Sequence, residues 1–150
     1  MKPKKLKANI EYTTPHGHVY RTDHKGRIKE VYADDLSLLD GGRNSYAQRT
    51  VGREDRLPDD DGGHLIARGF GGSKDIDNLV PQSKYINRSF KENGEWYNME
   101  KDWQKAIKGG GTIKNIKIEV KYSENSQRPN KFDVSCEING EERLYSIENI

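Results

Sequence analysis

The stretch that decides the fold reads Asp59-Asp60-Asp61-Gly62-Gly63-His64-Leu65-Ile66-Ala67. Its two glycines leave the backbone open to close approach by a bulky polyanion. The apolar residues 65–67 predict a short strand that holds the imidazole of His64 in one position. A histidine fixed in this way can take a proton from water near neutral pH. The stretch therefore predicts a site built around one histidine.

Four polar residues downstream of His64 can complete a hydrolytic site, namely Asn78, Gln82, Asn87 and Glu100. Hydrolysis of a phosphodiester needs an activated water and positive charge opposite the developing phosphorane. We expect His64 to be the general base and the Asn87 side-chain oxygen to hold Mg²⁺. Because Mg²⁺ keeps several waters, Glu100 can contact the ion through water. Asn78 and Gln82 are expected to orient His64 and its loop by hydrogen bonds.

Residues 95–108 carry the strongest helix signal, and Gly109-Gly110-Gly111 ends that helix. Glu100 falls at the edge of the apolar face. A carboxylate there needs a partner, so it either pairs with a nearby arginine or faces a hydrated metal ion. We favour the metal ion because of the other polar residues of the site. The apolar face consists of Trp96, Met99, Trp103, Ala106 and Ile107.

The rest of the chain predicts mainly short strands. Turn signals separate three strands of an antiparallel meander at residues 9–13, 18–22 and 28–32. Residues 53–63 read as a polar loop, residues 79–81 as a strand end, and residues 83–90 as the start of a helix, while residues 41–51 are ambiguous. Alternation returns between residues 113 and 138, and Asn139-Gly140 predicts a tight hairpin turn into residues 144–147.

Length and composition predict a single small domain. The chain has 150 residues, of which 31% are hydrophobic and 33% charged. We expect a basic linker over residues 1–8 and one domain over residues 9–150. No apolar run is long enough to span a membrane, and no secretory signal follows Met1. The lone Cys136 excludes an internal disulfide and a cysteine-based zinc site.

The net charge of +2 is too small to identify a nucleic-acid-binding protein. Residues 1–50 carry 10 basic and 6 acidic side chains, whereas residues 51–100 carry 7 and 10. A phosphate-binding cleft would therefore need basic groups from flanking segments. It would also need a bound cation to offset Asp59, Asp60 and Asp61.

Other metal and phosphate motifs fit less well. An EF-hand aligned on Gly62 would place Leu57 and Arg68 at ligand positions, and no Gly-Lys-Ser/Thr sequence forms a P-loop. The pair His16 and His18 could chelate a metal from one side of a strand, although an exposed turn is the favoured interpretation.

Taken in order, four motifs resemble those of the DNA/RNA non-specific endonucleases of the ββα-metal (His-Me finger) type. They are Gly62-Gly63-His64-Leu65-Ile66-Ala67, Asp77-Asn78-Leu79-Val80-Pro81-Gln82, Ile86-Asn87 and residues 96–100. The arrangement is similar to the C-terminal nuclease domains of bacterial polymorphic toxins, including LXG and type VII-exported toxins, over residues 9–149. The resemblance implies an α+β fold: antiparallel strands with an embedded ββα-metal nuclease core and a C-terminal β-hairpin.

The resemblance also implies roles for the site residues. It implies His64 as general base, Asn87 as the direct Mg²⁺ ligand, with Mn²⁺ as a substitute, and Glu100 as a water-mediated contact. Products with a 5′-phosphate and little sequence preference are expected. Relatives often carry an arginine where Gly62 stands here. The missing positive charge is therefore expected from Arg43, which lies in an Arg-Asn pair like that of relatives, or else from Arg49.

A toxin-type resemblance implies a domain that is secreted as part of a larger bacterial toxin and acts in the target-cell cytoplasm on DNA or RNA. It implies an immunity protein, which we expect to be acidic. No membrane partner is expected, because no apolar run is long enough to span a membrane. The alternative is a catalytically silent nucleic-acid or partner-binding module of the same fold. The presence of His64, both asparagines and Glu100 in this order argues against a catalytically silent module.

Overall fold

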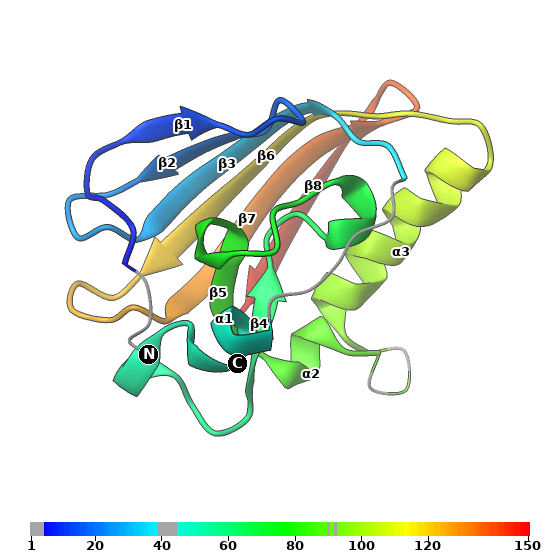
Figure 1. Ribbon diagram of the computed structural model, residues 1–150. Helices are drawn as coiled ribbons and strands as arrows, with labels where there is room; N and C mark the ends of the chain where they lie inside the picture. Colours follow the sequence, from blue (N-terminus) through cyan, green and yellow to red (C-terminus); the bar gives the residue numbers. More distant parts are fainter. Residues whose placement is uncertain (1–4, 39–44, 90, 92) are drawn as a thin grey trace.

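A six-stranded antiparallel sheet forms the main layer of the protein (Figure 1). The computed structural model describes residues 5–38, 45–89, 91 and 93–150. Because β3 pairs with β6, the predicted N-terminal meander and the predicted C-terminal strands join in one sheet, and both predictions are confirmed. In spatial order the strands are β1 (Glu11–Thr13), β2 (Val19–Thr22), β3 (Ile28–Asp35), β6 (Ile113–Tyr122), β7 (Pro129–Ile138) and β8 (Glu141–Glu148).

One face of this sheet is apolar and the other is exposed, as the period-two alternation of β7 illustrates. Phe132, Val134 and Cys136 are buried, and the residues between them are partly exposed. The predicted hairpin turn is also confirmed, since Asn139 and Gly140 both have positive φ angles, of 53° and 84°. The apolar face is the surface on which the rest of the chain packs.

Helix α3 (Glu95–Lys108) covers part of the apolar face and matches the predicted range. It buries Trp96, Met99 and Trp103 against the sheet, and the Trp96 ring centroid lies 5.0 Å from that of Phe132. Each such side chain contributes about 1.5–3 kcal/mol by leaving water. This packing holds Glu100 in place above the sheet.

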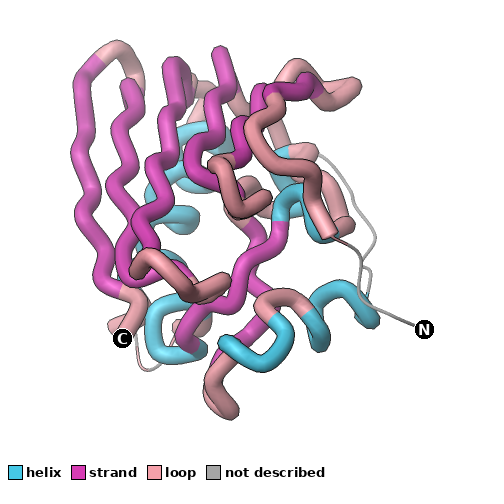
Figure 2. Tube along the Cα trace, turned by 90° about the vertical axis from the view of Figure 1, so that its left-hand side faces the viewer, coloured by secondary structure: helices cyan, strands magenta, loops and turns pink. Residues whose placement is uncertain are grey.

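A separate two-stranded hairpin lies over the same face and carries the decisive stretch (Figures 1 and 2). Strand β4 (Asp60–His64) pairs with β5 (Leu79–Ser83), from Asp60 opposite Ser83 to His64 opposite Leu79. Helix α2 (Lys84–Asn87) follows at once, and the Ser83 hydroxyl caps it by accepting from the Tyr85 amide at 3.2 Å. These three elements form the implied ββα unit. The shorter helices are α1 (Ser45–Thr50), η1 (Arg53–Asp55), η2 (Arg68–Phe70) and η3 (Ile76–Asn78).

Three local predictions were wrong or only partly right. A strand was expected at residues 65–67, but the chain forms a buried bend there. The strand that holds His64 is β4, and His64 is its last residue. Leu65 and Ile66 are both fully buried, and the side chain of Asn78 holds the bend by binding the amide and the carbonyl oxygen of Ile66. The predicted loop at residues 53–63 gives way to β4 at Asp60, and the helix expected at residues 83–90 covers only Lys84–Asn87.

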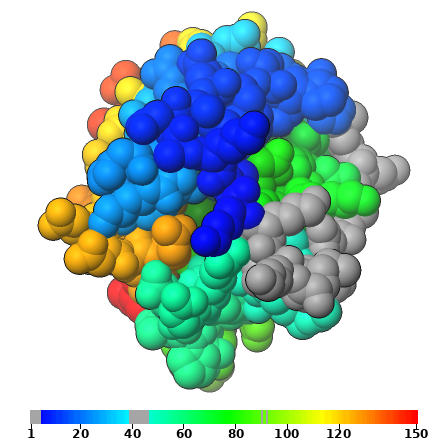
Figure 3. All heavy atoms as spheres, turned by 60° about the vertical axis from the view of Figure 1, so that its left-hand side comes forward, coloured from blue at the N-terminus to red at the C-terminus, as the bar shows by residue number. Residues whose placement is uncertain are grey.

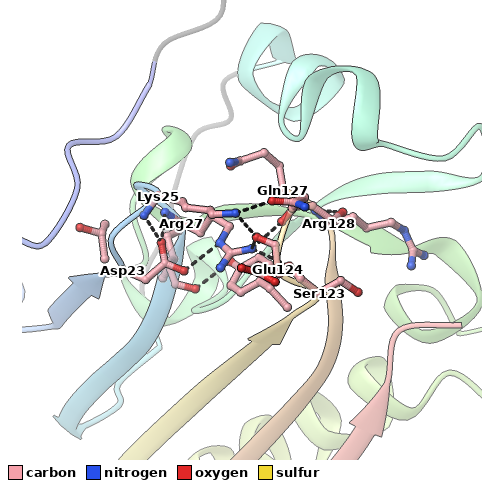
Figure 4. A network of polar contacts seen from close by, with 12 residues as sticks. Asp23, Lys25, Arg27, Ser123, Glu124, Gln127 and Arg128 are labelled. Atoms are coloured by element: carbon pink, nitrogen blue, oxygen red, sulfur yellow. Dashed lines mark hydrogen bonds and ion pairs between the residues drawn. The ribbon is translucent and has the colours of Figure 1, made fainter.

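The turn between β2 and β3 is tied to the turn between β6 and β7 by Arg27 (Figure 4). The buried Arg27 guanidinium donates to Asp23 at 2.8 Å and to the carbonyl oxygens of Ser123 and Ser126 at 2.7 and 2.9 Å. Burial by itself raises the pKa of Asp23, but hydrogen bonds from the backbone amides of Arg27 and Lys25 and the charge of Arg27 outweigh it, so the pKa is lowered. This contact joins sequence-distant parts of the sheet.

Within the described ranges, no helix has the length and apolar character needed to cross a membrane. Of the predicted linker at residues 1–8, the structure describes residues 5–8. There Leu6 packs against the core, and the Lys7 carbonyl accepts from the Thr22 hydroxyl at 2.6 Å.

Candidate active site

His64 is the last residue of β4 and lies opposite the first residue of β5. Its side chain is partly buried, and its Nε2 atom is shielded from solvent. The next two residues, Leu65 and Ile66, are fully buried. Strand pairing on one side and buried anchors on the other therefore fix the backbone from which the imidazole projects.

Asn78 clamps the bend that follows His64. Its Oδ1 accepts from the Ile66 amide at 2.9 Å and from the Tyr20 hydroxyl at 2.7 Å. Its Nδ2 donates to the carbonyl oxygens of Ile66 and Ser73 at 2.7 and 2.9 Å. With four bonds to these neighbours, the amide positions the loop, and it reaches His64 through the backbone rather than by direct contact.

Gln82 lies fully buried on β5, across the hairpin from Asp61. Its side chain covers Gly63, where an added Cβ would meet the amide oxygen at 2.4 Å. Neither Oε1 nor Nε2 of Gln82 has a hydrogen-bond partner among the described residues. An unsatisfied buried amide costs about 1–3 kcal/mol. The hydrogen bonds by which Gln82 was expected to orient His64 are therefore not formed among the described residues, and Gln82 contacts the strand of His64 by packing on Gly63.

Asn87 ends α2 and is held by a carboxylate that sequence reasoning did not single out. Its Nδ2 donates to Oδ2 of Asp61 at 3.0 Å. The same carboxylate takes two bonds from Arg88, at 2.6 and 3.0 Å. Burial by itself raises the pKa of Asp61, but the hydrogen bonds from Arg88 and Asn87 outweigh it, and the pKa lies below its usual value. An ionised Asp61 thus orients the Asn87 amide with its oxygen directed away from the carboxylate.

Glu100 is partly buried on α3, at the edge of the helix face that carries Trp96. Burial raises the pKa of Glu100 to about 8, and the Trp96 indole partly opposes this shift. In the described part of the chain Glu100 forms no ion pair, so the alternative in which it pairs with an arginine has no support. A desolvated carboxylate without a basic partner is a suitable contact for a hydrated cation.

The acidic run at residues 59–61 is neutralised by three basic side chains from different parts of the chain. The bound cation expected to offset these carboxylates is therefore not needed for that purpose. Its place in the site rests on other residues. The pairs are Asp59 with Lys84 at 3.3 Å, Asp60 with Arg128 at 2.7 Å and Asp61 with Arg88 at 2.6 Å.

A cleft of about 420 Å³ opens beside Asn87, and its lining includes three arginines. Arg49 lines the cleft from α1. Arg56 donates hydrogen bonds to the carbonyl oxygens of Gln48 and Asp60. The lining comprises Gln48, Arg49, Arg56, Asp61, Gly62, Asn87 and Arg88. The structure thus brings the second-choice arginine, Arg49, beside Asn87. The first choice, Arg43, lies outside the described residues.

Gly62 lines the same cleft and explains why no arginine occupies its position. A Cβ added there would lie 2.3 Å from the Gln48 carbonyl oxygen and 2.5 Å from its Cα. Helix α1 therefore occupies the space of any side chain at Gly62. Positive charge must reach the cleft from other elements.

A second cavity, of about 280 Å³, opens between the N-terminal segment, residues 50–54 and β5 (Figure 3). It contains none of the predicted site residues. The alternative metal site at His16 and His18 also gains no support, because the described residues include no group of three or more His, Cys, Asp and Glu side chains that could hold a metal. The expected turn is present with His16 and Gly17 exposed, but His18 is buried.

Comparisons with known proteins agree with this geometry. Residues 8–140 match the model of the DNA/RNA non-specific endonuclease family. The chain is 74% identical over 149 residues to the type VII secretion system protein EssD of Staphylococcus aureus strain USA300, and the same holds for EssD of strain NCTC 8325 / PS 47. These alignments cover 99% of this chain and 24% of each relative. The chain thus spans about a quarter of the length of these relatives.

Solved structures share the fold at low identity. NucA from Streptococcus agalactiae with no metal bound superposes with a TM-score of 0.68 at 17% identity, covering 98% of this chain and 76% of that one. The Sda1 nuclease with bound zinc gives a TM-score of 0.65 at 14% identity, covering 88% and 76%. These matches confirm the predicted α+β class and the ββα nuclease core.

Proposed function

The chain belongs to the DNA/RNA non-specific endonuclease family, and we propose that it is a Mg²⁺-dependent endonuclease that uses His64 and Asn87. The observation that carries the proposal is the amide of Asn87 in the cleft. Its nitrogen is bound to Asp61, which leaves its oxygen for a cation. NucA from S. agalactiae has been solved with magnesium bound and shares this fold with a TM-score of 0.65.

Each side chain of the proposed site has a separate role in hydrolysis. His64 takes the proton from the attacking water, because strand pairing and its buried neighbours hold the imidazole in one place. Asn87 and, through water, Glu100 hold the cation, which when bound supplies Lewis-acid stabilisation of the phosphorane. Asn78 fixes the loop behind His64, and Gln82 packs on Gly63 of the strand that ends at His64. Arg49 adds positive charge from α1.

Plasmid nicking with and without EDTA tests this function. The protein should convert supercoiled plasmid to nicked and linear forms, and EDTA should stop the conversion. Mg²⁺ or Mn²⁺ should restore it, and parallel assays with single-stranded RNA would report nucleic-acid preference. Undiminished cleavage in EDTA would contradict the metal assignment. A folded protein without cleavage under any of these conditions would favour the silent-module alternative.

We further propose that the domain acts as an antibacterial toxin carried by a larger secreted protein, with an acidic immunity protein as partner. The similarity to EssD, a type VII secretion system protein of Staphylococcus aureus, supports this proposal. An acidic partner would compete with phosphates for the arginines of the cleft. Expression of residues 1–150 in bacterial cytoplasm should be toxic, and co-expression with the product of the neighbouring gene should restore growth. Harmless accumulation of the active protein alone would contradict the toxin proposal.

A further inference from the structure

We infer that Arg88 binds a phosphate of the nucleic acid and that Asp61 holds its guanidinium in position for this contact; the inference rests on the proposed function. Arg88 follows Asn87 directly and lines the same cleft. Its side chain is 59% exposed, so a polyanion can reach it. Arg88 lies outside the sequence motifs and is not one of the arginines expected to stabilise the transition state.

The geometry of the Arg88–Asp61 pair indicates that the Arg88 guanidinium is oriented before the nucleic acid binds. Nε of Arg88 donates to Oδ2 of Asp61 at 3.0 Å, and Nη2 donates to Oδ1 at 2.6 Å. This fork uses one edge of the planar guanidinium and fixes its plane, and the N–H groups of Nη1 have no hydrogen-bond partner among the described residues. Because Asp61 also accepts from Asn87, one carboxylate sets the spacing between the cation-holding amide and the arginine.

Elimination among the other arginines of the cleft supports the same assignment. Arg56 donates to two backbone carbonyl oxygens and supports the hairpin. Gly62 cannot be replaced by a basic residue without displacing α1. Arg49 is exposed on α1 and forms no ion pair with a carboxylate of the described residues. Only Arg88, among the described residues that line the cleft, combines exposure with an oriented fork.

Phosphate contacts leave a measurable signature in the salt dependence of binding. Each neutralised phosphate of duplex DNA contributes about 0.9 to the slope of log affinity against log salt. Loss of the Arg88 contact should therefore reduce that slope by about one. Affinity at about 0.1 M salt should fall about 5- to 10-fold, which is less than a buried charged hydrogen bond would contribute, because Arg88 is largely exposed.

The experiment measures binding of a labelled duplex by fluorescence anisotropy, in the His64→Ala background so that the duplex stays intact, with Mg²⁺ and a series of NaCl concentrations. Arg88→Met is compared with Arg21→Met. Arg21 is the matched control, because it is 51% exposed, pairs with Glu11 at 2.7 Å and lies on β2 outside the cleft. Thermal melting of each variant controls for folding.

We expect Arg88→Met alone to lower the slope and the affinity, and Arg88→Lys to regain the slope because it restores the charge without the fork. An unchanged slope in a folded Arg88→Met variant, or an equal loss in Arg21→Met, would overturn the inference while leaving the proposed function standing. Absence of any duplex binding by the His64→Ala parent, with or without Mg²⁺, would overturn the proposed function together with this inference.

Discussion

Replacement of Arg128 by methionine should destabilise the hairpin that carries His64, because it leaves the buried Asp60 carboxylate without its basic partner. Arg128 donates to both oxygens of Asp60, at 2.7 and 2.9 Å, and the Asp60 side chain is only 1% exposed. Removing one partner of a buried ion pair costs about 3–5 kcal/mol, mostly because the remaining charge cannot regain its solvation. Methionine keeps much of the side-chain volume, so cavity formation adds little.

Urea denaturation followed by tryptophan fluorescence would measure this loss, since Trp96 and Trp103 are both buried in the core. Adding Asp60→Asn to Arg128→Met should recover at least about 1 kcal/mol, because a neutral amide costs less to bury than a carboxylate. The exposed Arg21–Glu11 pair is the control, and Arg21→Met should cost no more than about 1 kcal/mol. A loss below about 1 kcal/mol for Arg128→Met, or no recovery in the double variant, would refute the reasoning.

Three further predictions concern catalysis and pH. His64→Ala should lower kcat by about 10²- to 10⁴-fold without lowering the melting temperature, and near-normal turnover by the folded variant would exclude a general-base role. Asn87→Ala should raise the Mg²⁺ concentration needed for half-maximal cleavage more than Glu100→Ala does, because a direct ligand is lost in one case and a water-mediated contact in the other; the reverse order would contradict the assignment. Burial, and to a smaller extent the nearby His16, lowers the pKa of His18 in the folded protein. The unfolded chain therefore binds a proton at this imidazole more readily than the folded chain does. The free energy of unfolding should therefore fall as pH drops below about 6.5, and a His18→Gln variant should show a shallower fall between pH 7.5 and 5.

Several elements could be predicted from the sequence because neighbouring residues decide them. Residues 95–108 form α3 as predicted, since helical spacing of apolar residues and a glycine run are both local signals. Asn139 and Gly140 form the predicted turn because both residues tolerate positive φ. Residues 65–67 misled the prediction because an apolar run looks the same in a buried strand and in a buried bend. The side chain of Asn78, twelve residues beyond Ile66, stabilises the bend.

The sequence motifs pointed to His64, Asn87 and Glu100, which remain proposed site residues, but they did not indicate the surroundings of these side chains. Asp61 looks like one of three equivalent aspartates in the sequence, yet each of the three pairs with a different basic residue. Gly62 looks like a flexible position, yet the backbone of α1 requires it.

The sequence by itself determined the strands of the six-stranded sheet, the main helix, the hairpin turn at Asn139 and Gly140 and the chemical groups proposed for hydrolysis, because backbone preference and hydrophobic period act over a few residues. Only the tertiary structure decided which carboxylate meets which arginine, which amide is left unsatisfied and which glycine has no room for a side chain. These outcomes depend on distances between residues up to 68 positions apart, as between Asp60 and Arg128. Electrostatic pairing and steric exclusion act through space, so they are settled only once the hairpin has packed on the sheet.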